Sequence, residues 1–388
     1  MASCYTGGPM RNPAPVLLGL LLLSACGTPY APPTGNADAG PNTDAGLDGG
    51  QTDAGGEYDL PSIPYTVNEA PPIEAPKETW TFVPVPDAHC ANGSSTGMAV
   101  NLTDRSDRVL IFLAGGGACW EAAACALGTA THINDTMGEG PVLAEAKASS
   151  LAVFFDREDT SNPFRDASFV YIPYCTGDLH AGTRVHTYDW FGPRKIEHVG
   201  ARNMDAYLRR LRPTFHEARR VWLSGVSAGG YGATLHWWRV QKALPWARVD
   251  VLNDSGLIID TAADGRYGTM RQTWGLEFPP GCTQCTTGLS AVLDSSARLL
   301  TAPRRYGMLG YLQDGTIATY FGLNGAQVQT RMEAVRASAA SNVKTFYLPG
   351  NPHVVLSTPN TATSTGLTAR EWVRRLAEDD LAWEHAGP

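Results

Sequence analysis

The chain has 388 residues, of which 43% are hydrophobic and 18% charged, and its net charge is −8. These values suit one large globular domain with additional segments. The acidic balance, with no basic patch in the sequence, argues against a nucleic acid partner.

The N-terminal segment has the layout of an export signal. The apolar run Val16–Leu23 follows Arg11 and is too short to span a bilayer as a helix. The run ends in the letters LSAC, which resemble the lipobox of bacterial lipoproteins and predict lipidation at Cys26; an ordinary signal peptide without lipidation is the alternative. We therefore expect a signal peptide over residues 1–25 and an exported cell-envelope lipoprotein, on the outer membrane or cell surface.

A low-complexity segment follows the signal peptide. Residues 26–56 are rich in Asp, Gly, Ala and Pro and repeat Asp-Ala-Gly three times, so they cannot bury enough apolar surface to fold. This composition predicts a flexible tether, with the lipid anchor as the only membrane attachment. Residues 57–388 are expected to form a single catalytic domain. Translation can start at Met1 or at Met10, and the sequence leaves both starts open.

The cysteines indicate disulfides, which fits export. Six cysteines remain beyond Cys4 and Cys26, and their spacing favours three pairs: Cys119–Cys125, Cys282–Cys285 and the remaining Cys90–Cys175. Half a zinc site or a redox pair at Cys282 and Cys285 is the weaker alternative, because no second Cys pair or His pair completes a metal site. No metal and no other cofactor is expected.

Strand and helix patterns alternate along the rest of the chain. The expected strands are 80–85 (an edge strand), 108–113, 169–173, 221–223, 249–252, 306–312 and 343–348. The expected helices are 198–211, 228–242, 328–340 and 369–378, with residues 257–302 mostly helical around an irregular cap at 278–285. This order predicts an α/β-hydrolase-like fold, in which helices cover both faces of a mostly parallel central sheet.

The stretch VWLSGVSAGGYGA contains the candidate nucleophile. Gly225-Val226-Ser227-Ala228-Gly229 fits G-x-S-x-G, in which a strand turns sharply into a helix and exposes a serine hydroxyl. A Gly/Ser-rich surface turn is the alternative. The apolar strand before the motif and the long helical pattern after it favour the nucleophile.

A serine nucleophile needs a histidine base held by a carboxylate. Only His236, His353 and His385 follow Ser227; His236 lies in the same helix, and His385 lies in a tail that is expected to be frayed. His353 follows the last strand and is therefore the predicted base.

Two aspartates compete for the acid. Asp314 follows the second strand after the nucleophile and Asp254 the first. The usual topology favours Asp314, whereas Asp254 is expected to shape the site or bind substrate. Asp178, also after a strand, is a further candidate for either of those roles.

The oxyanion requires fixed N–H donors. Ala228, directly after the nucleophile, predicts one donor, and Gly115-Gly116-Gly117 follows an earlier strand where such glycine loops occur. Phosphate binding by this loop is disfavoured, because neither Lys-Ser/Thr nor G-x-G-x-x-G is present.

These segments resemble the pectin acetylesterase family with its Notum-like carboxylesterases. The matching pieces are LAGGGACW at 113–120, YIPYCTGD at 171–178, LSGVSAGGYGA at 223–233, NDSG at 253–256, and the regions of Asp314 and His353. The resemblance implies an extracellular α/β-hydrolase with Ser227, Asp314 and His353 as catalytic residues and Gly116, Gly117 and Ala228 as oxyanion donors.

The expected function is hydrolysis of an acyl ester, with acetyl groups on an extracellular polysaccharide as the leading substrate. Hydrolysis of a lipid acyl ester or a small ester is the first alternative. A non-catalytic surface lipoprotein that binds a glycan or another partner is the alternative of a different class. A monomer is expected.

Overall fold

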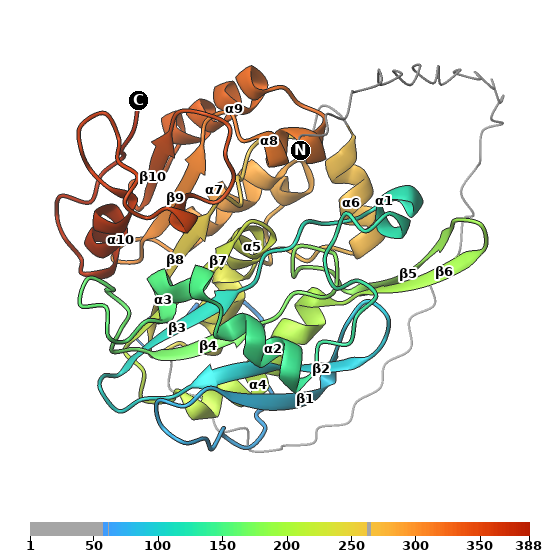
Figure 1. The fold of residues 1–388 in the computed structure, drawn as a ribbon, viewed down its shortest axis with the longest axis horizontal. Coiled ribbons are helices and arrows are strands. Elements are labelled where there is room, and N and C mark those ends of the chain that lie inside the picture. The colour runs from blue at the N-terminus through green and yellow to red at the C-terminus, as the bar shows by residue number, and fades with distance from the viewer. Residues whose placement is uncertain (1–56, 61, 262–264) are drawn as a thin grey trace, which may run out of the picture. The chain divides into compact units, whose positions relative to one another are not determined.

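A computed structural model describes residues 57–60, 62–261 and 265–388 (Figure 1). The predicted signal peptide, the lipidation site Cys26 and the predicted tether lie outside the described residues. Within the described part of the chain, no helix combines the length and the hydropathy that a bilayer crossing requires.

An eight-stranded sheet forms the centre of the fold, in the order β1-β2-β4-β3-β7-β8-β9-β10 (Figure 1). β2 is antiparallel to both of its neighbours, and every other adjacent pair is parallel, which confirms the mostly parallel sheet. The strands are β1 (Thr81–His89), β2 (Ser95–Asn101), β3 (Arg108–Leu113), β4 (Ser168–Ile172), β7 (Arg220–Val226), β8 (Arg248–Asp254), β9 (Tyr306–Tyr311) and β10 (Val343–Leu348).

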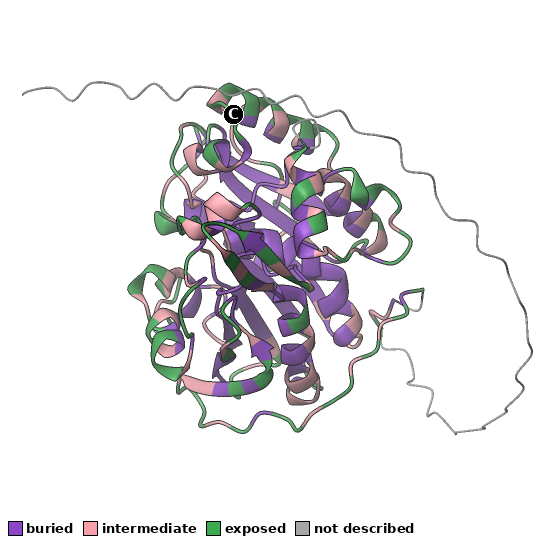
Figure 2. Ribbon diagram, turned by 90° about the vertical axis from the view of Figure 1, so that its right-hand side faces the viewer, coloured by how far each residue is buried: buried purple, intermediate pink, exposed green. Residues whose placement is uncertain are grey.

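The apolar sequences of the inner strands explain their place in the sheet. β3 reads RVLIFL, is buried from its second residue onward, and lies between β4 and β7. A run without alternation is typical of a strand covered on both faces. The inner strands are accordingly buried in Figure 2, while exposed residues gather on the outer helices and loops.

Helices cover both faces of the sheet. Successive side chains of a strand point to opposite faces, so neighbouring residues of β3 contact helices on opposite sides. Leu113 contacts the position of Gly232 in α5, whereas its neighbour Phe112 packs on Phe154 of α3. The face of α5 also carries α4, α7 and α9, and the face of α3 carries α2 and α10 (Figure 1). The helices are α1 (Ala122–Ala126), α2 (Glu139–Ala146), α3 (Ala152–Phe155), α4 (Gly200–Thr214), α5 (Ala228–Ala243), α6 (Arg266–Trp274), α7 (Leu289–Leu299), α8 (Gly315–Phe321), α9 (Gly325–Ala337) and α10 (Ala369–Ala377), with short 3₁₀ turns at Ser149–Leu151, Gln284–Thr286 and Val355–Ser357.

The segment 257–302 is less helical than predicted. Among the described residues of this segment, 257–261 and 265–302, helix occupies α6 and α7, a 3₁₀ turn lies at Gln284–Thr286, and the remainder is irregular. The turn coincides with the Cys282–Cys285 disulfide, inside the region where the irregular cap was expected. Gly275, in the left-handed conformation with φ of 66°, ends α6, so local turn chemistry shortens the helical stretch.

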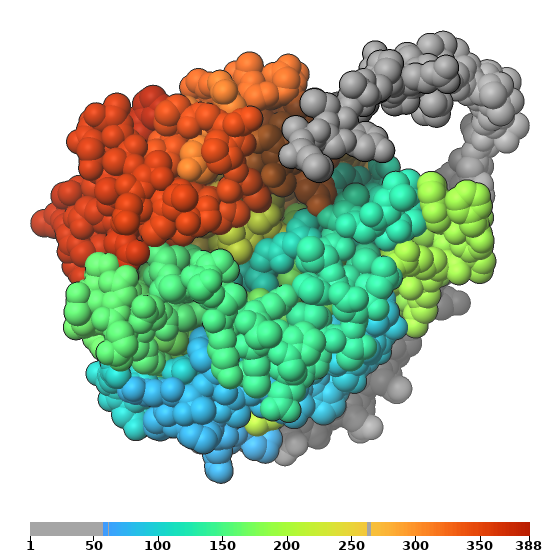
Figure 3. Space-filling view, in the orientation of Figure 1, coloured from blue at the N-terminus to red at the C-terminus, as the bar shows by residue number. Residues whose placement is uncertain are grey.

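A two-stranded hairpin that the sequence did not reveal projects beside α1. It consists of β5 (Arg184–Asp189) and β6 (Pro193–His198), which pair antiparallel. Tyr188 and Ile196 pack on the Cys119–Cys125 disulfide, and Phe191 at the tip is 99% exposed. Figure 3 shows the hairpin at the surface next to the α1 segment.

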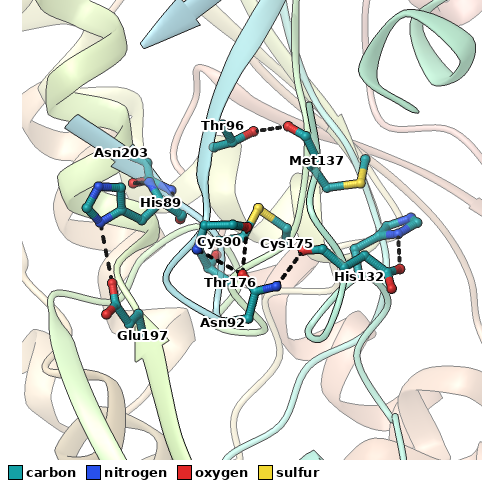
Figure 4. The surroundings of a disulfide bond; sticks show 12 residues. His89, Cys90, Asn92, Thr96, His132, Met137, Cys175, Thr176, Glu197 and Asn203 are labelled. Carbon is teal, nitrogen blue, oxygen red and sulfur yellow. Dashed lines mark hydrogen bonds and ion pairs between the residues drawn. A yellow bond between two sulfur atoms is a disulfide. The ribbon is translucent and has the colours of Figure 1, made fainter. Parts of the chain in front are cut away.

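The described residues form three disulfides, in the three predicted pairs: Cys90–Cys175, Cys119–Cys125 and Cys282–Cys285. Cys90–Cys175 joins the turn after β1 to the loop after β4 (Figure 4). Backbone bonds continue the connection, because Ala91 donates to the carbonyl of Cys175 and accepts from Glu197 of β6. Three disulfides fit an exported protein.

The C-terminal tail is ordered, and the prediction of a frayed tail around His385 was wrong. Ala386 and Phe346 of β10 form a parallel bridge, and the ring of His385 accepts a hydrogen bond from the backbone N–H of Thr345. β10 is the last strand of the sheet, so its free edge has N–H and C=O groups to satisfy. The tail supplies those partners.

Candidate active site

The turn between β7 and α5 puts Ser227 in a strained conformation. Its φ is 55° and its ψ is −118°, which only a tightly held residue adopts, and its N–H donates to the carbonyl of Asp254 at 2.8 Å. Gly225 and Gly229 permit the turn, because a Cβ on Gly225 would collide with Gly229 and one on Gly229 with the carbonyl of Leu113. The motif thus forms the strand–turn–helix that G-x-S-x-G predicts.

The glycine loop after β3 lies against this turn. A Cβ on Gly115 would stand 3.3 Å from the Cβ of Ser227, so the two segments are in contact. Gly116 and Gly117 have φ of 149° and 72°, and the carbonyl of Gly116 accepts from the N–H of Thr131. Gly117 and Ala228 line the same small cavity as Ser227, which brings two of the three predicted oxyanion residues to one place.

His353 and Asp314 are paired. Nδ1 of His353 lies 2.7 Å from Oδ2 of Asp314, and the other carboxylate oxygen accepts from the N–H of Ile317, which caps the start of α8. Asp314 is fully buried. Because a carboxylate only accepts, Nδ1 carries the proton and Nε2 is the basic nitrogen of the neutral ring. Nε2 is buried and has no hydrogen-bond partner within the described ranges.

Asp254 holds the loop that carries His353. Its two oxygens accept from the N–H groups of Val355 and Leu356 at 2.9 and 2.8 Å. The hydroxyl of Ser255 accepts from the N–H of Val354 and donates to Asp254. Burial raises the pKa of the Asp254 carboxyl, and the hydrogen bonds from these donors offset part of that rise. The structure therefore gives Asp314 the contact with the imidazole of His353, whereas Asp254 holds the backbone of Val355 and Leu356, two and three residues further along the same loop.

Asp178 lies away from the cavity walls. It is fully buried, and it accepts from the hydroxyl of Thr176 and from the N–H groups of Gly182 and Gly200. These bonds fix the loop after β4 to the start of α4. His180, on the same loop, has a ring nitrogen 2.9 Å from the carbonyl of Ala114, next to the glycine loop.

A small cavity opens beside Ser227. Its volume is about 20 Å³, enough for roughly one water-sized or methyl-sized group. A cavity of about 400 Å³ lies at the amino ends of β3 and β4, away from Ser227, and is unrelated to this site. The small cavity is lined by Gly117, Ala118, Trp120, Leu179, Ser227, Ala228, Tyr231, Met270, Ile317, Tyr320 and Phe321.

Sequence reasoning missed most of these wall residues. Met270 comes from α6, and Ile317, Tyr320 and Phe321 come from α8, a helix that was not expected. No local pattern marks such residues, because their role depends on how the segments pack over Ser227. Tyr231 stood inside the quoted motif and could have been found from its place one helical turn after Ser227.

One group of candidate metal ligands occurs in the described part of the chain. Cys119, Cys125 and His198 have ligand atoms within 4.8 Å of one another. The two sulfurs form a disulfide, and the ring nitrogens of His198 bond to the carbonyl of Thr176 and the hydroxyl of Tyr188. Because metals bind thiolates, this group holds no metal while the disulfide is intact.

An ion pair near the glycine loop predicts a pH dependence of stability. His132 lies 2.9 Å from Glu145 and from Asp135, and these partners raise its pKa to about 9. The added stability is complete below the unfolded pKa of 6.5 and is lost as the pH rises through about 9. Allowing for solvent screening at this half-exposed site, we expect a loss of about 1 kcal/mol.

Urea unfolding of wild type and His132→Gln from pH 6 to 10 measures this loss. The variant is expected to lack the decline across that range. Parallel curves for the two proteins would contradict the assignment to His132.

Fold and site together define the class of the protein as α/β-hydrolase-like, with Ser227 on the sharp turn after β7 and a His353–Asp314 pair from the loops after β10 and β9. The family follows from comparison with known proteins. Residues 75–278 match the model of the family described as Pectinacetylesterase, and the chain belongs to this family. The match includes Ser227 and the glycine loop and ends before Asp314 and His353.

Curated relatives agree at modest identity. The chain is similar to palmitoleoyl-protein carboxylesterase notum2 of Xenopus laevis, with 26% identity over 178 residues, which is 44% of this chain and 35% of the relative. It is also similar to palmitoleoyl-protein carboxylesterase NOTUM of Schmidtea mediterranea, with 28% identity over 163 residues, 41% of this chain and 29% of the relative. The chain thus spans about a third of the length of these relatives.

Proposed function

We propose that the protein is a serine esterase that removes short acyl groups, acetyl first among them, from an extracellular substrate such as an acetylated polysaccharide. The observation that carries this proposal is the pairing of Nδ1 of His353 with the buried Asp314, which makes Nε2 the basic nitrogen of the neutral ring, in a protein whose strained Ser227 lines a small cavity. Membership of the pectinacetylesterase family supports an acyl ester as substrate.

In the proposed mechanism Ser227 attacks the ester carbonyl. His353 takes the serine proton at Nε2 and returns it to the leaving alcohol, while Asp314 keeps Nδ1 protonated. N–H groups of Gly116, Gly117 and Ala228 stabilise the oxyanion. Water then hydrolyses the acyl-enzyme by the same route in reverse.

The size of the cavity favours a short acyl group. About 20 Å³ beside Ser227 suits a methyl group. The names of the curated relatives specify palmitoleoyl, a long fatty acyl chain, and a chain of that length would have to extend beyond the cavity of about 20 Å³. We therefore rank a long lipid acyl ester second.

The protein without residues 1–25 is expected to hydrolyse 4-nitrophenyl acetate at least about 100-fold faster, in kcat/KM, than 4-nitrophenyl octanoate, because the small cavity rejects added methylenes. It is also expected to react with a fluorophosphonate probe at Ser227. Ser227→Ala is expected to lose the labelling and to lower kcat about 10⁴-fold or more.

Ser338→Ala serves as the matched control. Ser338 follows α9 at the surface and bonds only to backbone carbonyls, so this variant should react like wild type. Labelling that survives in Ser227→Ala would refute the nucleophile. A wild type that binds acetylated glycan but neither reacts with the probe nor hydrolyses any ester would favour the binding lipoprotein instead.

We further propose that residues 57–388 work as one catalytic domain on a tether of residues 26–56, anchored by a lipid on Cys26 of an exported, monomeric protein. The LSAC sequence and the composition of the tether support this arrangement. Cys26→Ala is expected to move the protein from the membrane fraction to the soluble fraction of the envelope. Metabolic labelling with a fatty acid analogue tests the lipid directly.

A further inference from the structure

The side chain of His180 holds the start of the glycine loop. Its Nε2 lies 2.9 Å from the carbonyl oxygen of Ala114, the residue that joins β3 to Gly115. A carbonyl oxygen only accepts, so Nε2 carries the proton and donates it to this hydrogen bond. The side chain is buried, and burial lowers the pKa of the His180 ring, which agrees with a neutral imidazole. The bond joins the loop after β4 to the loop after β3.

The glycine loop depends on such outside contacts for its direction. Residues 115–117 have no Cβ, and glycine adopts many backbone conformations that other residues avoid. The carbonyl of Ala114 belongs to the same rigid peptide plane as the N–H of Gly115. The hydrogen bond from His180 therefore fixes the direction in which the loop leaves β3.

The loop after β4 contacts the glycine loop at two further points. A Cβ on Gly116 would stand 2.9 Å from the ring of Tyr174, whose centroid is 4.7 Å from that of His180. The N–H of Cys119 donates to the carbonyl of Gly177 at 2.9 Å. His180 thus belongs to a set of contacts that supports the glycine loop from its beginning to its end.

The helix α5, which begins directly after Ser227, holds His180 in turn. Nε2 of His236 lies 2.7 Å from the backbone carbonyl oxygen of His180, and Nδ1 of His236 lies 2.8 Å from a guanidinium nitrogen of Arg239. Gly232 leaves the space for this contact, because a Cβ there would stand 3.0 Å from the Cβ of His180. His180 therefore lies between the helix of the nucleophile and the glycine loop.

Arg239 determines which nitrogen of His236 carries the proton. A guanidinium only donates, so Nδ1 of His236 accepts and Nε2 donates to His180. Arg239 is itself buried and paired with Glu277 at 2.7 Å. Burial, together with the charge of Arg239, lowers the pKa of His236 well below its ordinary value, so the ring is neutral and has one donor and one acceptor.

Building on the proposed function, we propose that His180 is a positioning residue for the oxyanion site. Its ring fixes the glycine loop through Ala114, and its backbone is fixed to α5 through His236. The loop N–H groups and the hydroxyl of Ser227 thereby keep one relative position while negative charge develops on the carbonyl oxygen of the substrate. His180 acts through the loop and needs no contact with the substrate.

His180→Asn and His180→Gln form the matched pair that tests this role. Both replace the imidazole by a neutral amide, but they differ in reach. The amide nitrogen of glutamine is as many bonds from Cα as Nε2 of histidine, whereas that of asparagine is one bond closer and falls short of Ala114. The φ of His180 is 62°, a conformation that asparagine tolerates well, so the shorter variant adds no backbone strain.

With 4-nitrophenyl acetate, we expect His180→Asn to lower kcat about 10- to 100-fold and to change KM by less than about threefold, because the oxyanion exists only in the transition states and intermediates. His180→Gln, which keeps the donor, is expected to retain kcat within about threefold of wild type. Urea unfolding shows which variants are folded and can be compared.

His236→Asn provides a second variant, which decides the question if His180→Asn does not fold. Its side-chain oxygen can still accept from Arg239, but its amide no longer reaches the carbonyl of His180. We expect kcat to fall about tenfold at an unchanged KM.

Wild-type kcat in the folded asparagine variants would overturn the inference. Equal losses in His180→Asn and His180→Gln would also overturn it, because they would indicate that the ring acts by packing. A raised KM at an unchanged kcat would assign His180 to substrate binding instead. Each of these results requires an active wild type. If wild type hydrolyses no ester, the proposed function fails and the positioning role fails with it.

Discussion

Asp314→Asn is expected to lower kcat about 10⁴-fold. The asparagine amide can still cap α8 through its carbonyl oxygen, but its NH₂ group then faces Nδ1 of His353, which today donates to Asp314 at 2.7 Å. Nδ1 must become an acceptor, so the ring proton moves to Nε2. A protonated Nε2 cannot take the proton of Ser227. Steady-state kinetics with 4-nitrophenyl acetate measures the loss.

Asp254→Asn is the matched control, since it makes the same change at the rival acid. The asparagine side chain has one oxygen, so only one of the two backbone donors, Val355 or Leu356, keeps an acceptor, and the other faces an NH₂ group. We expect a loss of about 1–2 kcal/mol in unfolding free energy and a drop in kcat of only about 10- to 100-fold, because the His353 loop loosens. If Asp254→Asn abolishes activity while Asp314→Asn spares it, the roles of the two acids are reversed.

Removal of the Cys90–Cys175 disulfide is expected to cost about 4 kcal/mol of unfolding free energy, because its cysteines are 85 residues apart and the bond restricts a long loop of the unfolded chain. In the folded protein it joins the turn after β1 to the loop after β4. The Cys90→Ala/Cys175→Ala double variant, unfolded in urea, measures the effect.

Cys282→Ala/Cys285→Ala provides the comparison. These cysteines are three residues apart, so the same reasoning gives about 2 kcal/mol. Equal losses in the two double variants would show that native packing around the sulfurs, rather than loop length, determines the stabilisation.

The sequence predicted those parts of the site that depend on local geometry or chain order. The turn at Ser227 needs glycines on both sides, and the glycines are visible in the motif. Asp314 and His353 each follow a strand of a parallel sheet, and the carboxyl ends of such strands meet at one edge. Their pairing follows from topology, although they are 39 residues apart.

Features that depend on tertiary packing could not be predicted in this way. In the β5–β6 hairpin only Tyr188, Ile196 and His198 are buried. The alternation of apolar and polar residues that predicts a strand is therefore weak in this part of the sequence. The bonds of Asp254 run to residues 101 and 102 positions away. Nothing in the neighbourhood of His180 in the sequence indicates that its ring reaches the loop after β3.

The turn at Ser227 and the walls of the small cavity differ in how freely they can mutate. Gly225 and Gly229 have no space for a side chain, so the residues that hold Ser227 in its turn tolerate no substitution. Met270, Ile317 and Phe321 come instead from helices that follow the strands, and no sheet hydrogen bond depends on them. Under the proposed esterase function, substitutions in α6 and α8 would change the acyl group that is accepted and would leave the turn at Ser227 intact.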